Sequence, residues 1–445
     1  MTTPQTLSDY IQQTSANWLD QGVPYAPFLV KTATTATQIW DATGNDGFVA
    51  FWQPDVPVDG FRPLGGICAR DGNGPDTYGI TMIKPMDGQE SAVADPTGWA
   101  IPFTDAHSGN PRDLVAWYPI PPAGYVSLGL WFNGGDTPPT NAVYCVRQDL
   151  VVQLPSGDFW NDSGLGFSDD GHLGRATFSV NPDGTIAQNV PGKILFVPNV
   201  YVYGTFFDFG AGLFQSLPYG LLLSEINAPD TIAADPAIPV LNNPALSPTG
   251  SETAHGVQEV TVVPYLGIID SALPTGRAKA SPFYYVSCEP FYTLTLAFHA
   301  GLPSTETERL TTGITKEETD GFEKTTSVTV SATAGVEIGP ASGSVSFEMT
   351  NALAISHSET NSYMVETELS IGVEIPANTS FERWRRTLGI QIYRADGTPL
   401  ETSLNAVSAN DVFDVAFPLG QKIRERDVEI NVPGVRMRQD LARTA

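Results

Sequence analysis

The chain has 445 residues, of which 49 are acidic and 23 are basic, so its formal charge is −26. A protein that grips nucleic acid neutralises phosphates with Lys and Arg, so this balance argues against DNA or RNA as a partner. A charged fraction of only 16%, together with 42 Gly and 36 Pro, is typical of a chain of short strands and turns.

The chain begins with MTTPQTLSDYIQQTSANW, which has neither a basic start nor an apolar core. No run of 18 apolar residues occurs anywhere in the sequence. We therefore expect a protein made in soluble form without a signal peptide and released to act extracellularly on a target cell membrane. Within this opening segment we expect a short helix with Ser8 as its N-cap.

A repeat follows the opening segment. Trp52 recurs as Trp117 and Gly60 as Gly124, a spacing of 65 or 64 residues. A third, degraded copy starts at Trp160 and lacks the Trp-x-Pro-x-Pro element of the other two. Because one unit alone cannot cover its own apolar face, three like units predict a pseudo-threefold all-β body, in which the third unit is not strictly equivalent.

The repeats carry a resemblance. The strings IWDATGNDGFVAFWQPDVPVDGFRPLGG, LVAWYPIPPAGYVSLG and YCVRQDLV resemble the repeating units of the vacuolar protein sorting-associated protein 62 family. The likeness covers about residues 30–203 and implies a β-prism-like fold with a binding role. We therefore expect a receptor- or glycan-binding domain over residues 1–203.

Residues 227–256 are rich in Pro, Ala, Asn and Asp, which predicts an extended connection inside a second domain over residues 204–445. The later motifs of this domain resemble the pore-forming domain of the insecticidal binary-toxin family of spore-forming bacteria. The matching residues are Ser281, Pro282, Tyr284, Thr312, Gly313, Ile314, Thr315, Arg394, Asp396, Gly397 and Thr398. The resemblance implies an elongated aerolysin-type β-sheet domain. Binary toxins usually carry a β-trefoil in front, so their receptors are not carried over to this chain.

Residues 327–356 contain two segments that alternate between apolar and polar side chains around the turn-forming sequence Gly-Pro-Ala-Ser-Gly. A tilted strand crosses a bilayer with about 9–11 residues, apolar outside and polar inside. The two segments therefore predict a membrane-inserting hairpin, and closing a barrel from such hairpins requires a homo-oligomer. The predicted lipid-facing residues are Val328, Val330, Ala332, Ala334, Val336, Ile338, Val345, Phe347, Met349, Leu353 and Ile355.

Two alternatives stay open in this domain. Amphipathic strands of this length also occur in soluble sheets, where the hairpin would have only a structural role. The aromatic run from Phe283 to Phe298 fits contact with a membrane interface, because Tyr-rich clusters gather there. A strand buried in the core explains the same run, and we favour that interpretation.

Acidic residues recur at the turns of the repeats, where loops on a rigid scaffold commonly bind ligands. Carboxylates there suit Ca²⁺ or sugar hydroxyls, but Asp is also a common turn residue, and the turn interpretation is favoured. No metal site is predicted. The candidate receptor-binding residues are Asp41, Asp46, Asp105, Asp113, Asp162, Asp169 and Asp170.

The sequence favours no enzyme class. It contains no His-Glu-x-x-His pair, no Gly-x-Ser-x-Gly elbow, no Walker loop and no dinucleotide fingerprint. We therefore predict neither catalysis nor a cofactor. The leading hypothesis is an insecticidal β-pore-forming toxin that binds a surface receptor, with a glycan as one candidate, oligomerises and inserts a hairpin; a partner toxin subunit stays an open question. The alternative is a non-lytic, lectin-like carbohydrate-binding protein.

Overall fold

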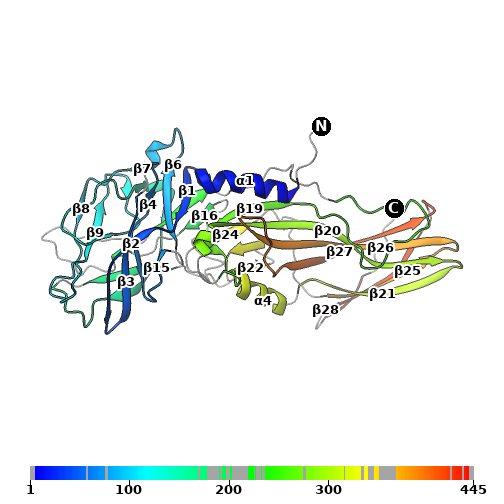
Figure 1. Ribbon diagram of the computed structural model, residues 1–445. Coiled ribbons are helices and arrows are strands. Elements are labelled where there is room, and N and C mark those ends of the chain that lie inside the picture. The colour runs from blue at the N-terminus through cyan, green and yellow to red at the C-terminus, as the bar shows by residue number, and fades with distance from the viewer. Residues whose placement is uncertain are drawn as a thin grey trace.

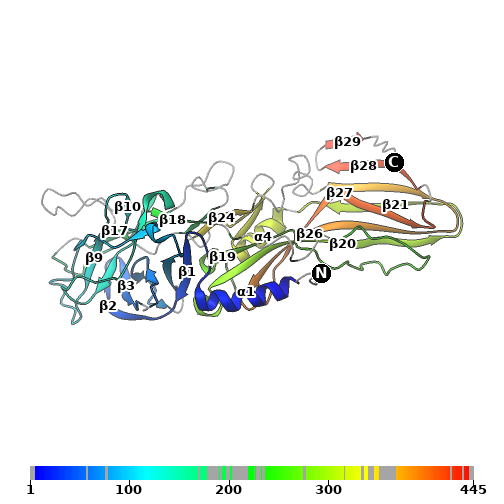
Figure 2. The ribbon, with the colours of Figure 1, turned by 90° about the horizontal axis from the view of Figure 1, so that it is seen from above.

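The computed structural model is an elongated, mainly β molecule, in which a front body of short strands is followed by a rear body of long strands (Figures 1 and 2). The front body comprises the described residues of 23–202 and the rear body those of 236–439. The structure describes residues 6–56, 59–75, 79–168, 171–177, 190, 193–196, 201–202, 219–224, 226, 232, 236–273, 277–314, 316–331, 335–338, 345–349, 367–420, 423–432 and 435–439.

The front body contains short antiparallel strands and two 3₁₀ turns. They are β1 (Phe28–Ala33), β2 (Ala36–Gly44), β3 (Gly47–Pro54), β4 (Arg62–Pro63), β5 (Ile67–Ala69), β6 (Ile80–Pro85), η1 (Glu90–Ala92), β7 (Val93–Ala94), β8 (Gly98–Ala100), β9 (Val115–Ile120), β10 (Tyr125–Val126), β11 (Trp131–Asn133), β12 (Cys145–Arg147), η2 (Gln148–Leu150), β13 (Val151–Gln153), β14 (Ser156–Asn161), β15 (His172–Ala176), β16 (Lys193–Phe196) and β17 (Tyr201–Val202).

Each repeat forms its own three-stranded sheet, in the orders β2-β3-β5, β11-β9-β8 and β14-β15-β17. The rings of Phe51, Phe132 and Trp160 come from the three different sheets, and Phe51 packs edge to face against the other two. The centroid of the Phe51 ring lies 4.9 Å from that of Phe132 and 5.5 Å from that of Trp160. Aromatic pairs in this geometry add to the stabilisation from burial. The predicted pseudo-threefold body is confirmed, and the degraded third copy takes its place in it.

Between the two bodies along the chain lies β18 (Tyr219–Ser224). The rear body contains the longest strands of the molecule. Its elements are β19 (Glu259–Pro264), η3 (Tyr265–Gly267), α3 (Arg277–Ala280), β20 (Phe283–Ala300), β21 (Ser304–Thr312), α4 (Lys316–Thr326), β22 (Val328–Ser331), β23 (Gly335–Ile338), β24 (Val345–Met349), β25 (Thr367–Ile375), β26 (Thr379–Arg394), β27 (Leu404–Phe417), β28 (Arg424–Val432) and β29 (Val435–Gln439).

Two antiparallel sheets run along the rear body, in the orders β19-β20-β26-β27 and β21-β25-β28-β29. Strand β20 has 18 residues and pairs with β26 over almost its whole length. The aromatic run lies in β20, where Tyr284 and Tyr285 are fully buried and Phe298 packs against Phe381 at 5.5 Å. The prediction of an elongated β-sheet body and the buried-strand interpretation of this run are both confirmed.

The opening helix α1 (Leu7–Gln21) is confirmed, but its N-cap is Thr6 and not Ser8. The Thr6 hydroxyl accepts a hydrogen bond from Asp9 N at 3.1 Å, and the Asp9 carboxylate accepts one from Thr6 N at 3.3 Å. This reciprocal capping box satisfies two backbone donors that would otherwise be orphaned. The helix lies against the rear body, where Trp18 stacks on Tyr285 at 6.1 Å.

One core spans the junction of the two bodies. Val30 and Ile83 from the front share it with Val262 and Val286 from the rear, all of them buried. A six-stranded sheet in the order β13-β18-β16-β24-β23-β22 also combines strands from both sides. The boundary predicted between residues 203 and 204 lies outside the described residues and stays a prediction. The described part of the 227–256 connection contains no helix or strand.

Candidate functional site

Three loops of the front body meet at one end of the aromatic core, and we call them the loop cluster. The loop cluster consists of residues 41–46, 105–113 and 161–168. Asn45 N donates to Ser163 O at 2.7 Å, and Asn110 Nδ2 donates to Asp41 O at 2.8 Å. These bonds join the first repeat to the third and the second repeat to the first, so loops far apart in sequence form one surface.

Asp105 supports the loop cluster from within. It is 6% exposed, and its carboxylate accepts hydrogen bonds from Trp40 Nε1 at 2.7 Å and from Leu114 N at 2.8 Å. Hydrogen bonds to a buried carboxylate are among the strong ones in proteins. Of the two interpretations of Asp105, the structure favours the turn-forming one, because its oxygens are already engaged below the surface.

Two other predicted loop residues form ion pairs at the surface. The Asp41 carboxylate lies 3.1 Å from the Arg112 guanidinium, and the Asp46 carboxylate lies 3.2 Å from the Arg70 guanidinium. The Asp41–Arg112 pair is the more exposed of the two, and exposed pairs contribute little to stability, so a ligand could replace this pair at small cost. Asp113 is exposed beside them. The loop cluster therefore offers carboxylates and the Arg112 guanidinium to a polar ligand.

Of the three predicted binding residues in the third repeat, the structure describes only Asp162. Asp162 lies in a turn, where its backbone N donates to Gly171 O at 2.9 Å and its carbonyl accepts from Leu165 N at 2.9 Å. Asp169 and Asp170 lie outside the described residues. Across the part of the chain that the structure describes, no group of three His, Cys, Asp or Glu side chains could hold a metal ion.

The segment predicted to insert is a three-stranded meander in this structure. Strand β22 pairs with β23 from Val328↔Ile338 to Ser331↔Gly335, and β23 pairs in turn with β24. The sequence predicts one continuous strand over residues 327–338, and the structure corrects this, because the two halves of that strand pair with each other. Val328, predicted to face lipid, is fully buried in the junction core.

The other predicted lipid-facing residues can be placed only in part. The backbone of β22, β23 and β24 holds Val330, Val336, Ile338, Val345, Phe347 and Met349. Ala332, Ala334, Leu353 and Ile355 lie outside the described residues. Insertion of this segment into a membrane stays a prediction.

A strained residue connects α4 to the meander. Ser327 is fully buried and has a φ of 65°, a backbone conformation that is uncommon for residues other than glycine. On either side, Val328 N donates to the Thr326 hydroxyl at 3.2 Å and Ile269 N donates to Thr326 O at 3.0 Å. Strain of this kind persists only where the surroundings enforce it, so the base of the meander is held by its contacts with the core.

The motif residues of the rear resemblance form a clamp between β20 and β26. Arg394 donates to both oxygens of Asp270, at 2.7 and 2.9 Å, and the Tyr284 hydroxyl donates to the same carboxylate at 3.0 Å. Burial opposes the charge on Asp270, but the bonds from Arg394 and Tyr284 outweigh it and lower the pKa of this carboxyl. Ser281 Oγ accepts from Ala395 N at 3.0 Å. These motif residues therefore have a structural role here.

A second charged cluster was not predicted from the sequence. Arg383 of β26 is fully buried and donates to both oxygens of Asp414 on β27, at 2.7 and 2.8 Å. Glu308 of β21 lies 3.5 Å from Arg383. Burial raises the pKa of Glu308 despite the nearby guanidinium. The cluster connects the two rear sheets, and no sequence pattern distinguishes these three residues from ordinary polar strand positions.

The comparisons with known proteins bear on the front body. The vacuolar protein sorting-associated protein 62 family matches residues 28–160 of this chain, which confirms the resemblance of the repeats. No curated protein matches the chain. Among the described residues, no helix is long and apolar enough to cross a membrane.

Two solved structures are similar to parts of the chain. GNIP1Aa from Chromobacterium piscinae is 23% identical to this chain, with a TM-score of 0.30. The match covers 36% of this chain and 32% of GNIP1Aa. The chain thus spans about a third of the length of GNIP1Aa. Cry35Ab1 is 12% identical, with 88% of this chain and 89% of that chain covered and a TM-score of 0.32.

Proposed function

We propose that this protein is a β-pore-forming toxin, insecticidal in its target range, that binds a cell surface with its front body and inserts the 327–356 segment into the membrane. The observation that carries the proposal is the alternating pattern of that segment, which suits a barrel strand, combined with its folded-back form in this structure. A strand that must stay soluble before insertion benefits from being kept short and paired.

The front body supplies the binding step in this proposal. The loop cluster exposes carboxylates and the Arg112 guanidinium on a rigid scaffold, which is where recognition residues usually lie. Insertion then requires β22 and β23 to separate and join into one strand. A barrel has no open edge in lipid, so several copies of the chain contribute hairpins to it.

A reversible cross-link tests the insertion step. Thr329 and Glu337 are paired across β22 and β23, at a spacing that a disulfide can bridge. In a single extended strand the same two residues would be about 26 Å apart. The variant Thr329→Cys/Glu337→Cys, once oxidised, is therefore expected to lose dye release from liposomes and to regain it after reduction.

The matched control carries the same two substitutions elsewhere. Thr311 and Glu368 are paired across β21 and β25, outside the segment. The oxidised control variant is expected to release dye as the unmodified protein does. The three native cysteines are buried and do not compete for the cross-link. Release from the oxidised Thr329→Cys/Glu337→Cys variant would show that residues 327–338 do not insert as one strand.

The convergence of the repeat loops favours a second candidate, a lectin-like protein that binds carbohydrate without lysing cells. In that case the rear body is a stalk, and the protein binds cells but releases no dye from any liposome. Loss of cell binding after substitution of the exposed Asp113, with dye release absent throughout, would favour this alternative.

A further inference from the structure

A pocket of about 180 Å³ lies where the two bodies meet. Its walls come from α1, from β1 and β6 of the front body, from β16, and from α3 and the start of β20 in the rear body. The junction around it is tightly packed: a methyl group added at Gly79 would lie 2.7 Å from Thr32 and 2.8 Å from Ala278. The pocket is therefore a feature of a closely fitted junction.

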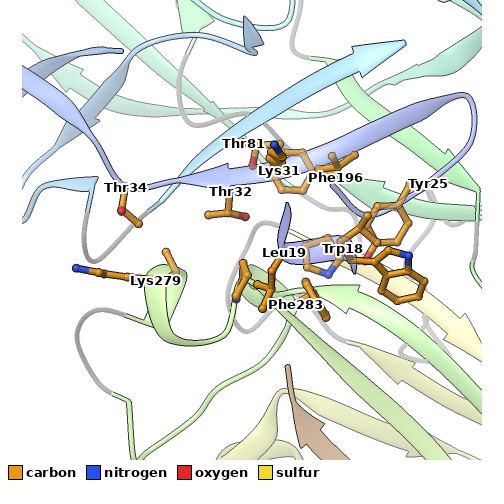
Figure 3. A pocket seen from close by; sticks show the side chains of 15 residues that line it. Trp18, Leu19, Tyr25, Lys31, Thr32, Thr34, Thr81, Phe196, Lys279 and Phe283 are labelled. Atoms are coloured by element: carbon orange, nitrogen blue, oxygen red, sulfur yellow. The ribbon is translucent and has the colours of Figure 1, made fainter. Parts of the chain in front are cut away.

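The lining of the pocket changes character from one end to the other. Trp18 and Tyr25 lie at one end, and Lys279 and Thr34 lie at the other (Figure 3). The aromatic end is buried, with Trp18 9% and Tyr25 1% exposed. Lys279 is exposed. One end thus suits an apolar group and the other a polar group in contact with water.

The charged side chains that line the pocket are basic, although the chain as a whole is acidic. The chain has 49 acidic and 23 basic residues, and only seven lysines, yet two of the lysines, Lys31 and Lys279, line this pocket, and no acidic residue among those that the structure describes does so. Lys31 is already paired with Asp59 at 3.3 Å. Among the residues that the structure places, Lys279 has no ion-pair partner, so its charge is available to a ligand.

We propose that this pocket binds a small amphipathic anion, with the apolar tail against Trp18 and the head group at Lys279. The inference does not rest on the proposed function. Pockets for drug-sized ligands have about 300–1,000 Å³, so this smaller pocket suits a short alkyl chain with a carboxylate head. The ligand would contact both bodies and so stabilise their junction by binding only the folded state.

Titration calorimetry of the full chain with sodium octanoate tests the proposal, with octanol and octyltrimethylammonium as the neutral and cationic probes. We expect saturable binding of octanoate, weaker binding of octanol, no binding of the cation, and a larger rise in the melting temperature with octanoate than with octanol. An exposed charge contact contributes about 0.2–1 kcal/mol, so Lys279→Ala should weaken octanoate binding up to about fivefold and leave octanol unaffected.

Lys84→Ala is the matched control, because Lys84 lies on β6 but outside the pocket. It should bind octanoate as the unmodified chain does. The charge at position 279 is exposed, so its removal is not expected to disturb folding. Absence of octanoate binding would overturn the proposal, as would equal binding of octanoate and octanol or an equal effect of the two lysine substitutions.

Discussion

The front and rear bodies are held together by different chemistry. The front core is made largely of aromatic rings, several of which pack edge to face, and the buried Asp105 carboxylate beside it accepts hydrogen bonds from Trp40 and Leu114. The rear body buries paired charges, at Arg383 with Asp414 and at Asp270 with Arg394. Apolar packing responds weakly to pH, whereas a buried ion pair depends on the charge of both partners. The rear body thus contains buried ion pairs that protonation of a carboxylate would break.

The largest expected effect comes from removing one partner of the buried rear cluster. Arg383→Met leaves the carboxylates of Asp414 and Glu308 without their cation, which costs about 3–5 kcal/mol in free energy of unfolding. We expect the rear body to unfold at lower denaturant concentration than the front. Limited proteolysis during denaturation, read out by mass spectrometry, would locate the first cuts.

A triple variant separates charge from packing at this cluster. Glu308→Leu/Arg383→Met/Asp414→Leu removes all three charges and should recover most of the lost stability, since well-packed apolar replacements of buried ion pairs are often neutral. A triple variant no more stable than Arg383→Met would mean that the cluster acts through shape and not through charge.

The next largest effect concerns the inserting segment. An arginine that faces lipid at the middle of the bilayer costs about 2–4 kcal/mol, so Val330→Arg or Phe347→Arg should abolish dye release while the circular dichroism spectrum stays unchanged. Thr329→Arg, on the face predicted to line the lumen, should keep most of the release. Equal release from all three variants would contradict the assigned faces.

A smaller effect is expected in the front body. Asp105→Ala leaves the buried donors of Trp40 and Leu114 unsatisfied, which costs about 1–3 kcal/mol. Asp113→Ala, at an exposed loop position, should change stability by less than about 0.5 kcal/mol. Thermal unfolding of the two variants gives the comparison. If both were equally stable, the bonds to Asp105 would not support the loop cluster as the geometry suggests.

Much of the front body could be predicted from the sequence because Trp, Pro and Gly residues recur at a regular spacing in its repeat. Trp52 and Trp117 mark equivalent strands, and even the degraded unit at Trp160 takes its expected place. Alternation likewise predicts strands in the rear body. A period of two gives the strand but not its partner, so it could not show that residues 327–338 fold back into β22 and β23.

The side-chain clusters were harder to predict. Glu308, Arg383 and Asp414 lie on three strands, and only the pairing of those strands brings them together. The junction pocket has the same origin, because Trp18 and Lys279 are 261 positions apart. Sequence spacing contains no information about such contacts, and the fold has to be known first.

The last prediction uses the acid side of the pH profile to test the clamp at Asp270. The pKa of Asp270 is lowered in the folded chain, so the folded state favours the charged carboxylate more than the unfolded state does. Its contribution to stability is present above the ordinary Asp pKa of about 3.9 and is lost as the pH falls through the lower, folded value. Asp270→Asn should therefore be less stable at neutral pH but lose less stability than the unmodified chain between pH 5 and 3, as measured by urea unfolding at each pH.

Asp113→Asn, at an exposed position, is the control and should show the same slope of stability against pH as the unmodified chain. Parallel slopes for Asp270→Asn and the unmodified chain would place the acid sensitivity of the rear body elsewhere, and Asp270 would then hold Arg394 by geometry alone.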